Sequence, residues 1–243
     1  MTPTEKTPQQ VQEALARLFD PDQVKWKPQS VKNDRALAIA YVDSRTVQDR
    51  LDDAVGIGGW KTEFTVLPTG SVECRLSLWL GGQWVTKADV GSPSEQPDEG
   101  DRTKAAYSDA LKRAAVQFGA GRYLYRLPQQ WQPYDAKTRK FVERPALPSW
   151  AVPADCKPCG PAMAAKVAAL VKTVCEATKS DTAQTTEKVL AEFRVPRGKG
   201  LEALRHRDAA AVLQRLNATV EKLARAGETK PQPPTPAATG RAG

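Results

Sequence analysis

Side chains that could bind nucleic acid are concentrated in residues 108–127. Helical spacing in the first part of this stretch places Lys112 beside Arg113, and residues 122–126 read Arg-Tyr-Leu-Tyr-Arg after two glycines. Lysine and arginine neutralise phosphates, and tyrosine rings can stack on bases. The stretch therefore predicts contact with single-stranded nucleic acid, and its candidate phosphate contacts are Lys112, Arg113, Arg122 and Arg126.

The phase of the predicted helix over residues 101–118 separates its apolar side from its basic side. At about 100° per residue, Leu111 and Phe118 fall in one apolar stripe that we expect to pack on a sheet. Lys112 and Arg113 lie near the opposite side, so we expect them to face outward. They could contact DNA there or simply form a solvated helix face.

The tyrosines after this helix have two open interpretations. Tyr123 and Tyr125 could stack on bases, each stack contributing about 1–3 kcal/mol, or they could lie in the core while nearby arginines form ion pairs. A second basic run with aromatic residues, 134–144, is either a DNA-contacting arm or a solvated loop. Its candidate contacts are Lys137, Arg139 and Lys140, and Lys104 in the long helix is a further candidate.

Charge is distributed unevenly along the 243 residues, whose net charge is +8. Residues 1–100 carry 11 basic and 15 acidic side chains, residues 101–153 carry 10 and 4, and residues 154–243 carry 15 and 9. This asymmetry is typical of a localised field that attracts a polyanion, with chance asymmetry as the alternative. No apolar run approaches the roughly 20 residues of a membrane span. We therefore expect a cytoplasmic, nucleoid-associated protein with no membrane partner.

The periodicity of the chain predicts an α+β fold. A short strand is expected over residues 35–42, and helical spacing follows over 44–54, where Asp43 or Ser44 can cap the helix. From 60 to 90, apolar and polar residues alternate with a period of two between glycine-containing turns, which predicts an antiparallel β-meander. The long helix then backs this sheet and gives a β-β-β-α core.

Three regions follow from these patterns. Residues 1–153 are predicted to form the DNA-binding domain, and the family resemblance given below implies that it is also the oligomerisation domain. Within it, 20–34 reads as a polar connector, and 128–153, which contains five prolines, reads as irregular structure. Residues 160–226 are predicted to be a small helical region. The tail 227–243, rich in proline, threonine and glycine, is expected to be disordered.

Two other functions fit parts of the pattern. Carboxylates such as Asp52, Asp53 and Asp98 could serve a metal-dependent nuclease, but a helix end and a loop do not predict the convergence that such catalysis needs. A monomeric single-strand binder of the OB type needs five strands that close a barrel, and we count about four before the long helix. Cys156 and Cys159 have metal-ligand spacing without further ligands nearby, so we expect no metal and no cofactor.

Two segments carry a resemblance to a known family. They are the helix end and turn Leu51-Asp-Asp-Ala-Val-Gly-Ile-Gly-Gly-Trp60 and the helix Asp109-Ala-Leu-Lys-Arg-Ala-x-x-x-Phe118-Gly. With the β-meander between them, they resemble the bacterial branch of the Rad fifty-two superfamily of single-strand annealing proteins. The likeness in the order of elements covers about residues 8–150.

This resemblance implies a protein without a catalytic centre that forms a homo-oligomeric ring. Single-stranded DNA would follow a basic groove on the outside of the ring, and the protein would shield single strands, especially 3′ ends, from nucleases during double-strand-break repair, with strand annealing as a further activity. Lys112 and Arg113 match basic positions of the family groove, and Arg45 matches another. Val116 departs from the pattern because eukaryotic relatives have an arginine there, so one groove charge is missing.

Overall fold

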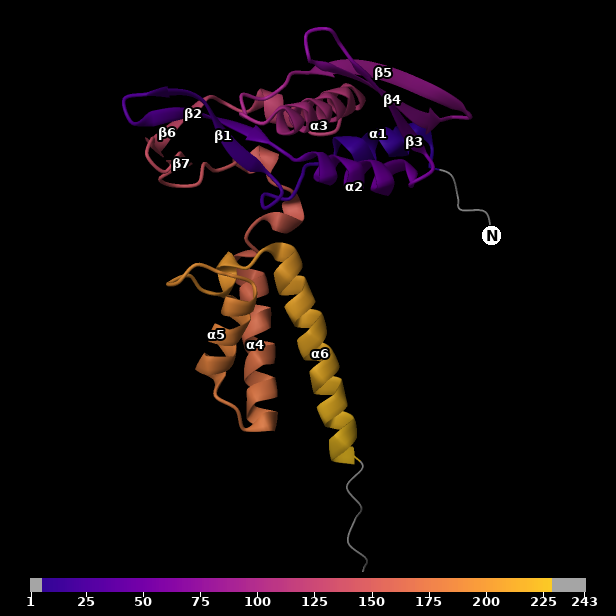
Figure 1. Cartoon of the computed structure of the whole chain (residues 1–243). Coiled ribbons are helices and arrows are strands. Elements are labelled where there is room, and N and C mark those ends of the chain that lie inside the picture. The colour runs from indigo at the N-terminus through magenta and orange to yellow at the C-terminus, as the bar shows by residue number, and fades with distance from the viewer. Residues whose placement is uncertain (1–5, 229–243) are drawn as a thin grey trace, which may run out of the picture. The chain divides into compact units, whose positions relative to one another are not determined.

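In the computed structural model, which describes residues 6–228, the helices and strands form two separate units, Met1–Pro153 and Ala154–Gly243 (Figure 1). The first unit contains, in order, α1 (Pro8–Ala16), β1 (Lys25–Lys32), β2 (Arg35–Tyr41), α2 (Ser44–Val55), β3 (Trp60–Val66), β4 (Val72–Leu80), β5 (Gln83–Gly91), α3 (Glu99–Phe118), the 3₁₀ helix η1 (Arg122–Arg126), β6 (Gln130–Asp135), β7 (Lys140–Phe141) and η2 (Ser149–Ala151). The second contains η3 (Ala154–Cys156), α4 (Gly160–Thr178), α5 (Thr182–Glu192), η4 (Leu201–Ala203) and α6 (His206–Glu228).

The antiparallel β3-β4-β5 sheet packs against α3 and confirms the predicted β-meander backed by a long helix. One face of β4 provides Cys74, Leu76 and Leu78, which are fully buried in the core between the sheet and the helices. Gly91 lets α3 approach β5 closely, because a Cβ at this position would lie 2.3 Å from the backbone oxygen of Ala106. The α+β class predicted from periodicity is therefore confirmed.

The helix α2 forms as its sequence predicts. The Asp43 side chain caps it by accepting a hydrogen bond from the backbone N–H of Thr46 at 3.0 Å. Val47 and Leu51 lie on the buried side of the helix. The helix ends at Gly56, whose φ of +78° favours glycine. This cap fixes the start of α2 directly beside the end of β2.

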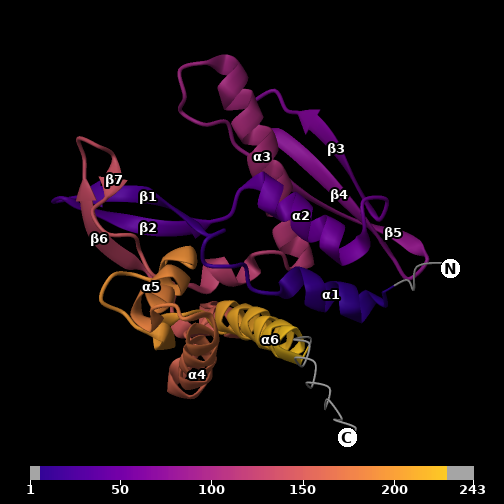
Figure 2. The same cartoon turned by 90° about the horizontal axis from the view of Figure 1, so that it is seen from below.

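A second sheet, in the order β1-β2-β6-β7, lies on the other side of α3 from the meander (Figure 2). Its presence corrects two predictions, because residues 20–34 contain β1 and residues 128–153 contain β6 and β7. Residues 6–98 hold five strands rather than about four, and they belong to two antiparallel sheets instead of one closed barrel. The second sheet matters for function because β1 and β2 face Lys112 of α3 across a groove.

The second unit is built from three helices that pack around their own apolar core. Val167 and Val171 of α4, Val189 of α5 and Val212 of α6 are buried together. This helical region was predicted over residues 160–226. Of the predicted disordered tail, residues 227 and 228 end α6, and the rest lies outside the described residues. Within residues 6–228, none of the helices combines the length and the apolar character that crossing a membrane requires.

Candidate nucleic-acid interface

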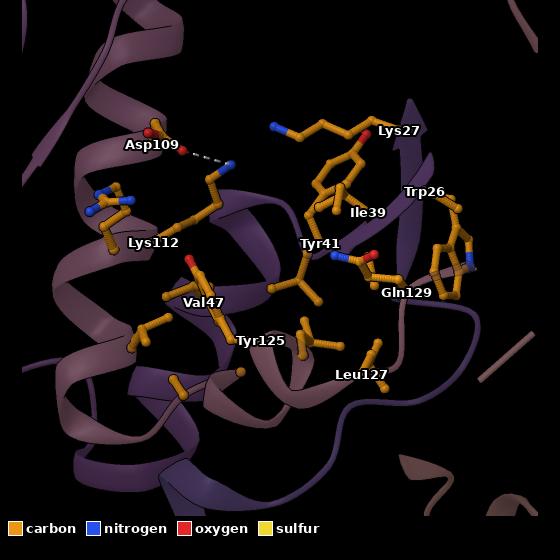
Figure 3. A pocket seen from close by; sticks show the side chains of 18 of the residues that line it. Trp26, Lys27, Ile39, Tyr41, Val47, Asp109, Lys112, Tyr125, Leu127 and Gln129 are labelled. Atoms are coloured by element: carbon orange, nitrogen blue, oxygen red, sulfur yellow. Dashed lines mark ion pairs between the residues drawn. The ribbon is translucent and has the colours of Figure 1, made fainter. Parts of the chain in front are cut away.

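A groove of ≈ 390 Å³ lies between α3, η1 and the β1–β2 strands of the first unit (Figure 3). Its lining combines an apolar base with aromatic rings and cationic side chains. The apolar residues include Ile39, Val47, Leu124 and Leu127, the rings belong to Trp26, Tyr41 and Tyr125, and the cations belong to Lys27, Lys112 and Arg113. Rings beside cations are the combination that single-stranded nucleic acid requires.

Lys112 reaches into this groove from α3. Its side chain is only 23% exposed, and its ammonium nitrogen lies 3.7 Å from an Asp109 carboxylate oxygen and 5.7 Å from the centre of the Tyr41 ring. Burial lowers the pKa of Lys112, and the Asp109 charge opposes this effect. The prediction that Lys112 faces outward is therefore wrong. The helix phase is as predicted, but β1 and β2 face this side of α3 across the groove and leave Lys112 only partly exposed.

Lys27 reaches toward the same ring from the opposite wall of the groove. Its ammonium nitrogen lies 5.8 Å from the centre of the Tyr41 ring, within the range of a cation–π contact. Figure 3 shows Lys27 and Lys112 pointing toward each other across the mouth of the groove. Lys27 was not among the predicted candidates because residues 20–34 read as a polar connector. Only the pairing of β1 with β2 places its side chain at the groove.

Arg113 lies at the rim of the groove and is exposed, as predicted. Its guanidinium donates a hydrogen bond from Nε to an Asp89 carboxylate oxygen at 3.0 Å, and Gln117 donates to the other oxygen at 3.2 Å. Burial alone would raise the pKa of Asp89, but these hydrogen bonds and one from the Val90 N–H outweigh burial and lower it. Arg113 is thus held in place by β5 beside the groove.

The other arginines of the candidate set have different surroundings. Arg45 is exposed in the first turn of α2 and does not line the groove. Arg122 donates hydrogen bonds to the backbone oxygens of Val116 and Gln117, so it caps the end of α3 instead of forming the ion pair considered above. Arg126 is exposed at the end of η1.

The remaining candidates lie outside the groove lining. Lys104 is 80% exposed near the start of α3 and pairs with Asp101 at 3.2 Å. Lys137, Arg139 and Lys140 are exposed on the turn and strand that join β6 to β7. The aromatic residues of this run, Tyr134 and Phe141, pack edge to face at 5.4 Å, and Tyr134 is buried. The run is therefore a basic β-hairpin whose aromatic residues stabilise it.

Tyr123 and Tyr125, for which stacking and core packing were both open, have different surroundings in the structure. Tyr123 packs against the core, and its hydroxyl accepts a hydrogen bond from the backbone N–H of Phe19 at 3.2 Å. Tyr125 is 69% exposed and lines the groove. Only Tyr125 is therefore placed where a base could stack on it.

The carboxylates and cysteines considered for metal binding make contacts of their own. Asp52 accepts a hydrogen bond from the indole nitrogen of Trp60 at 2.7 Å, and the Asp98 side chain caps α3 through the N–H of Asp101. The Cys159 thiol donates to the backbone oxygen of Leu201. Residues 6–228 contain no cluster of three histidine, cysteine or acidic side chains arranged to hold a metal ion.

Comparison with known proteins identifies the family of the groove-bearing unit. Residues 7–141 match the family described as Rad52/22 family double-strand break repair protein, and this range spans every element from α1 to β7. The chain belongs to this family. The resemblance inferred from the glycine turn and the long helix is thereby confirmed.

Two relatives of this Rad52/22 family protein come from Deinococcus deserti and Deinococcus radiodurans. Both are called single-stranded DNA-binding protein DdrA. They are 47% and 46% identical to it over 150 residues. The match covers 59% of this chain, and 70% and 68% of the respective relatives. No solved structure shows significant similarity to the chain.

Proposed function

We propose that this Rad52/22 family protein binds single-stranded DNA in the groove between α3 and the β1–β2 strands. The observation that carries the proposal is the Tyr41 ring, which has the ammonium groups of Lys27 and Lys112 within 6 Å of its centre, at 5.8 and 5.7 Å. Two relatives that carry the name single-stranded DNA-binding protein support the same ligand.

In this groove, charged side chains would contact the phosphates and an aromatic ring would stack on a base. Lys27 and Lys112 come from opposite walls, so a strand lying between them would have phosphates neutralised from both sides and would release counterions. Tyr125 offers an exposed ring for a base at the same groove. Arg113 at the rim and Arg45 on the neighbouring helix would extend the phosphate contacts along the strand. None of these contacts reads a base edge, so binding would depend little on sequence.

The biological role that this chemistry supports is the protection of DNA ends without catalysis. A bound strand, especially one with a free 3′ end, would be covered against nucleases during repair, and two covered strands could then be annealed. We further propose that the first unit forms the homo-oligomeric ring and binds DNA, and that the protein acts at the nucleoid in the cytoplasm. The basic hairpin with Lys137, Arg139 and Lys140 would add exposed positive charge for longer strands.

Measurements of binding, cleavage and mass test the proposed function. Fluorescence anisotropy with labelled single-stranded and duplex oligonucleotides, with and without Mg²⁺, should show tight binding to the single strand and no loss of full-length DNA on a denaturing gel. Cleavage of the DNA would favour the nuclease instead, and equal affinity for duplex would refute the proposed ligand. Light scattering after size exclusion should give the mass of a multimer, whereas a monomer mass would refute the ring.

A further inference from the structure

The helical unit carries its excess positive charge at one end. Residues 154–160 and 193–208 hold six basic and three acidic side chains, whereas the rest of the unit up to residue 228 holds seven and six. We call the six residues the basic end; they are Lys157, Arg194, Arg197, Lys199, Arg205 and Arg207. Helices α4 and α6 begin at this end, and the connection that follows α5 returns to it (Figure 1).

Backbone hydrogen bonds fasten the segments of the basic end to one another. The N–H of His206 donates to the oxygen of Lys157 at 2.8 Å, and the N–H of Cys159 donates to the oxygen of Leu204 at 2.7 Å. A turn closed by the Lys199 N–H and the Pro196 oxygen, at 3.1 Å, presents exposed basic side chains on both sides of Gly198. The positive charges are thus carried by a hydrogen-bonded turn on a packed helical bundle.

The surroundings of this charge indicate the class of its ligand. Among residues 154–225, no large hydrophobic side chain is exposed, so this surface lacks the apolar anchors that membrane insertion and most protein interfaces use. Arginine and lysine without exposed apolar neighbours suit a polyanion that is held by its phosphates. Lys157 also lies only four residues beyond Pro153, the last residue of the groove-bearing unit, so only a short stretch of chain connects the two units.

We propose that the basic end of the helical unit binds the phosphates of the same single strand that occupies the groove, through Arg194, Arg197 and Lys199. This inference rests on the proposed function and assigns a role to the second unit. Linking two weak contacts by a short connection raises the affinity for strands long enough to reach both. Short strands that fill the groove alone gain nothing from the basic end.

The test compares two variants of the full chain that lose equal charge. The loop variant carries Arg194→Gln, Arg197→Gln and Lys199→Gln, and the control variant carries Lys166→Gln, Lys188→Gln and Lys222→Gln, which are exposed on the three helices. Each is titrated by anisotropy with thymidine oligonucleotides of about 8 and about 30 nucleotides, lengths within and beyond the reach of one binding site.

We expect the loop variant to bind the long strand up to about 100-fold more weakly at about 0.1 M salt, with a salt slope reduced by about 2, since each phosphate contact contributes about 0.7 to the slope. It should bind the short strand like wild type, and the control variant should match wild type on both. A loop variant that matches wild type on the long strand, or that loses as much on the short one, overturns the inference. A wild-type chain that binds neither strand overturns the proposed function and this inference with it.

A second pair of variants separates loss of binding from loss of folding. Arg194 and Lys179 both have left-handed backbone conformations, with φ of 54° and 56°, and they follow α5 and α4 at opposite ends of the bundle. Arg194→Gly and Lys179→Gly should both keep or raise the thermal midpoint, because glycine adopts this conformation freely. Only Arg194→Gly should reduce the salt slope on the long strand, by about 0.7; equal slopes for the two variants would contradict the proposal.

Discussion

Replacing Lys112 by methionine should weaken DNA binding without weakening the fold. The Lys112 side chain is only 23% exposed, and burial lowers its pKa, so the charged form is less favourable in the folded protein than in water. Methionine keeps the length of the apolar stem and removes the charge whose partial burial is unfavourable. We therefore expect the thermal midpoint of Lys112→Met to equal or exceed that of the wild-type protein.

The expected loss of affinity has a lower and an upper bound. Loss of one phosphate contact reduces the salt slope by about 0.7, which is about fivefold in affinity at about 0.1 M salt. A hydrogen bond to a charged group in a partly buried site contributes about 1.5–3 kcal/mol, or roughly 10- to 150-fold. The partial burial of Lys112 places the expected loss toward the upper part of this range.

The assay is anisotropy with a single-stranded oligonucleotide at several salt concentrations between about 50 and 200 mM. Lys104→Met is the matched control, because Lys104 lies on the same helix but is 80% exposed and does not line the groove. Its affinity should stay within about twofold of wild type. The assignment of the groove is refuted if Lys112→Met keeps the wild-type affinity and slope, or if Lys104→Met loses as much as Lys112→Met does.

Three further substitutions test stacking, packing and electrostatics. Tyr125→Ala should lower single-strand affinity by about 1–3 kcal/mol at an unchanged salt slope, because its exposed ring carries no charge. Gly91→Ala should lower the free energy of unfolding by about 1–3 kcal/mol in a denaturant titration, because its Cβ would meet the backbone of α3 at 2.3 Å, whereas Gly58→Ala has open space and should change it less. The hydrogen bond from Lys25 lowers the pKa of Asp43 to about 2. The ionised Asp43 carboxylate therefore stabilises the fold fully above about pH 4, and this stabilisation is lost as the pH falls from 4 to 2. In Asp43→Asn, the free energy of unfolding should not show this loss between pH 4 and 2, which is about 1 kcal/mol after allowance for solvent screening. Unfolding curves measured at both pH values test it.

The parts of the fold that could be predicted from sequence are those whose signal is local. The meander shows its period of two along β4, and α2 shows its cap and apolar spacing within a dozen residues. By contrast, β1 is exposed along nearly its whole length and contains Pro28, so neither alternation nor composition marks it as a strand. β6 is paired with β2 from almost a hundred residues earlier, as in the pairing of Leu37 with Trp131. Such pairing leaves no local trace.

The same distinction explains which part of the candidate site was found. Lys112 and Arg113 were selected because they stand together on a helix whose phase can be calculated. Lys27 was not, because its partner across the groove, Lys112, lies 85 residues away in sequence. A single sequence can therefore reveal one wall of a groove when that wall is a regular element. The opposite wall depends on tertiary contacts that the sequence pattern does not display.

The position of Lys27 also changes how the missing charge at Val116 is understood. Val116 lines the groove, so the position where the family resemblance implies an arginine is apolar in this chain. If α3 alone supplied the cations of the groove, the groove would have one cation fewer than the family pattern. With Lys27 supplied from β1, the two ammonium groups flank Tyr41 from opposite walls, at 5.8 and 5.7 Å from its ring. The charge is therefore placed across the groove instead of along one helix, and a strand held there would be gripped between the walls, with the apolar surface of Val116 beneath its bases.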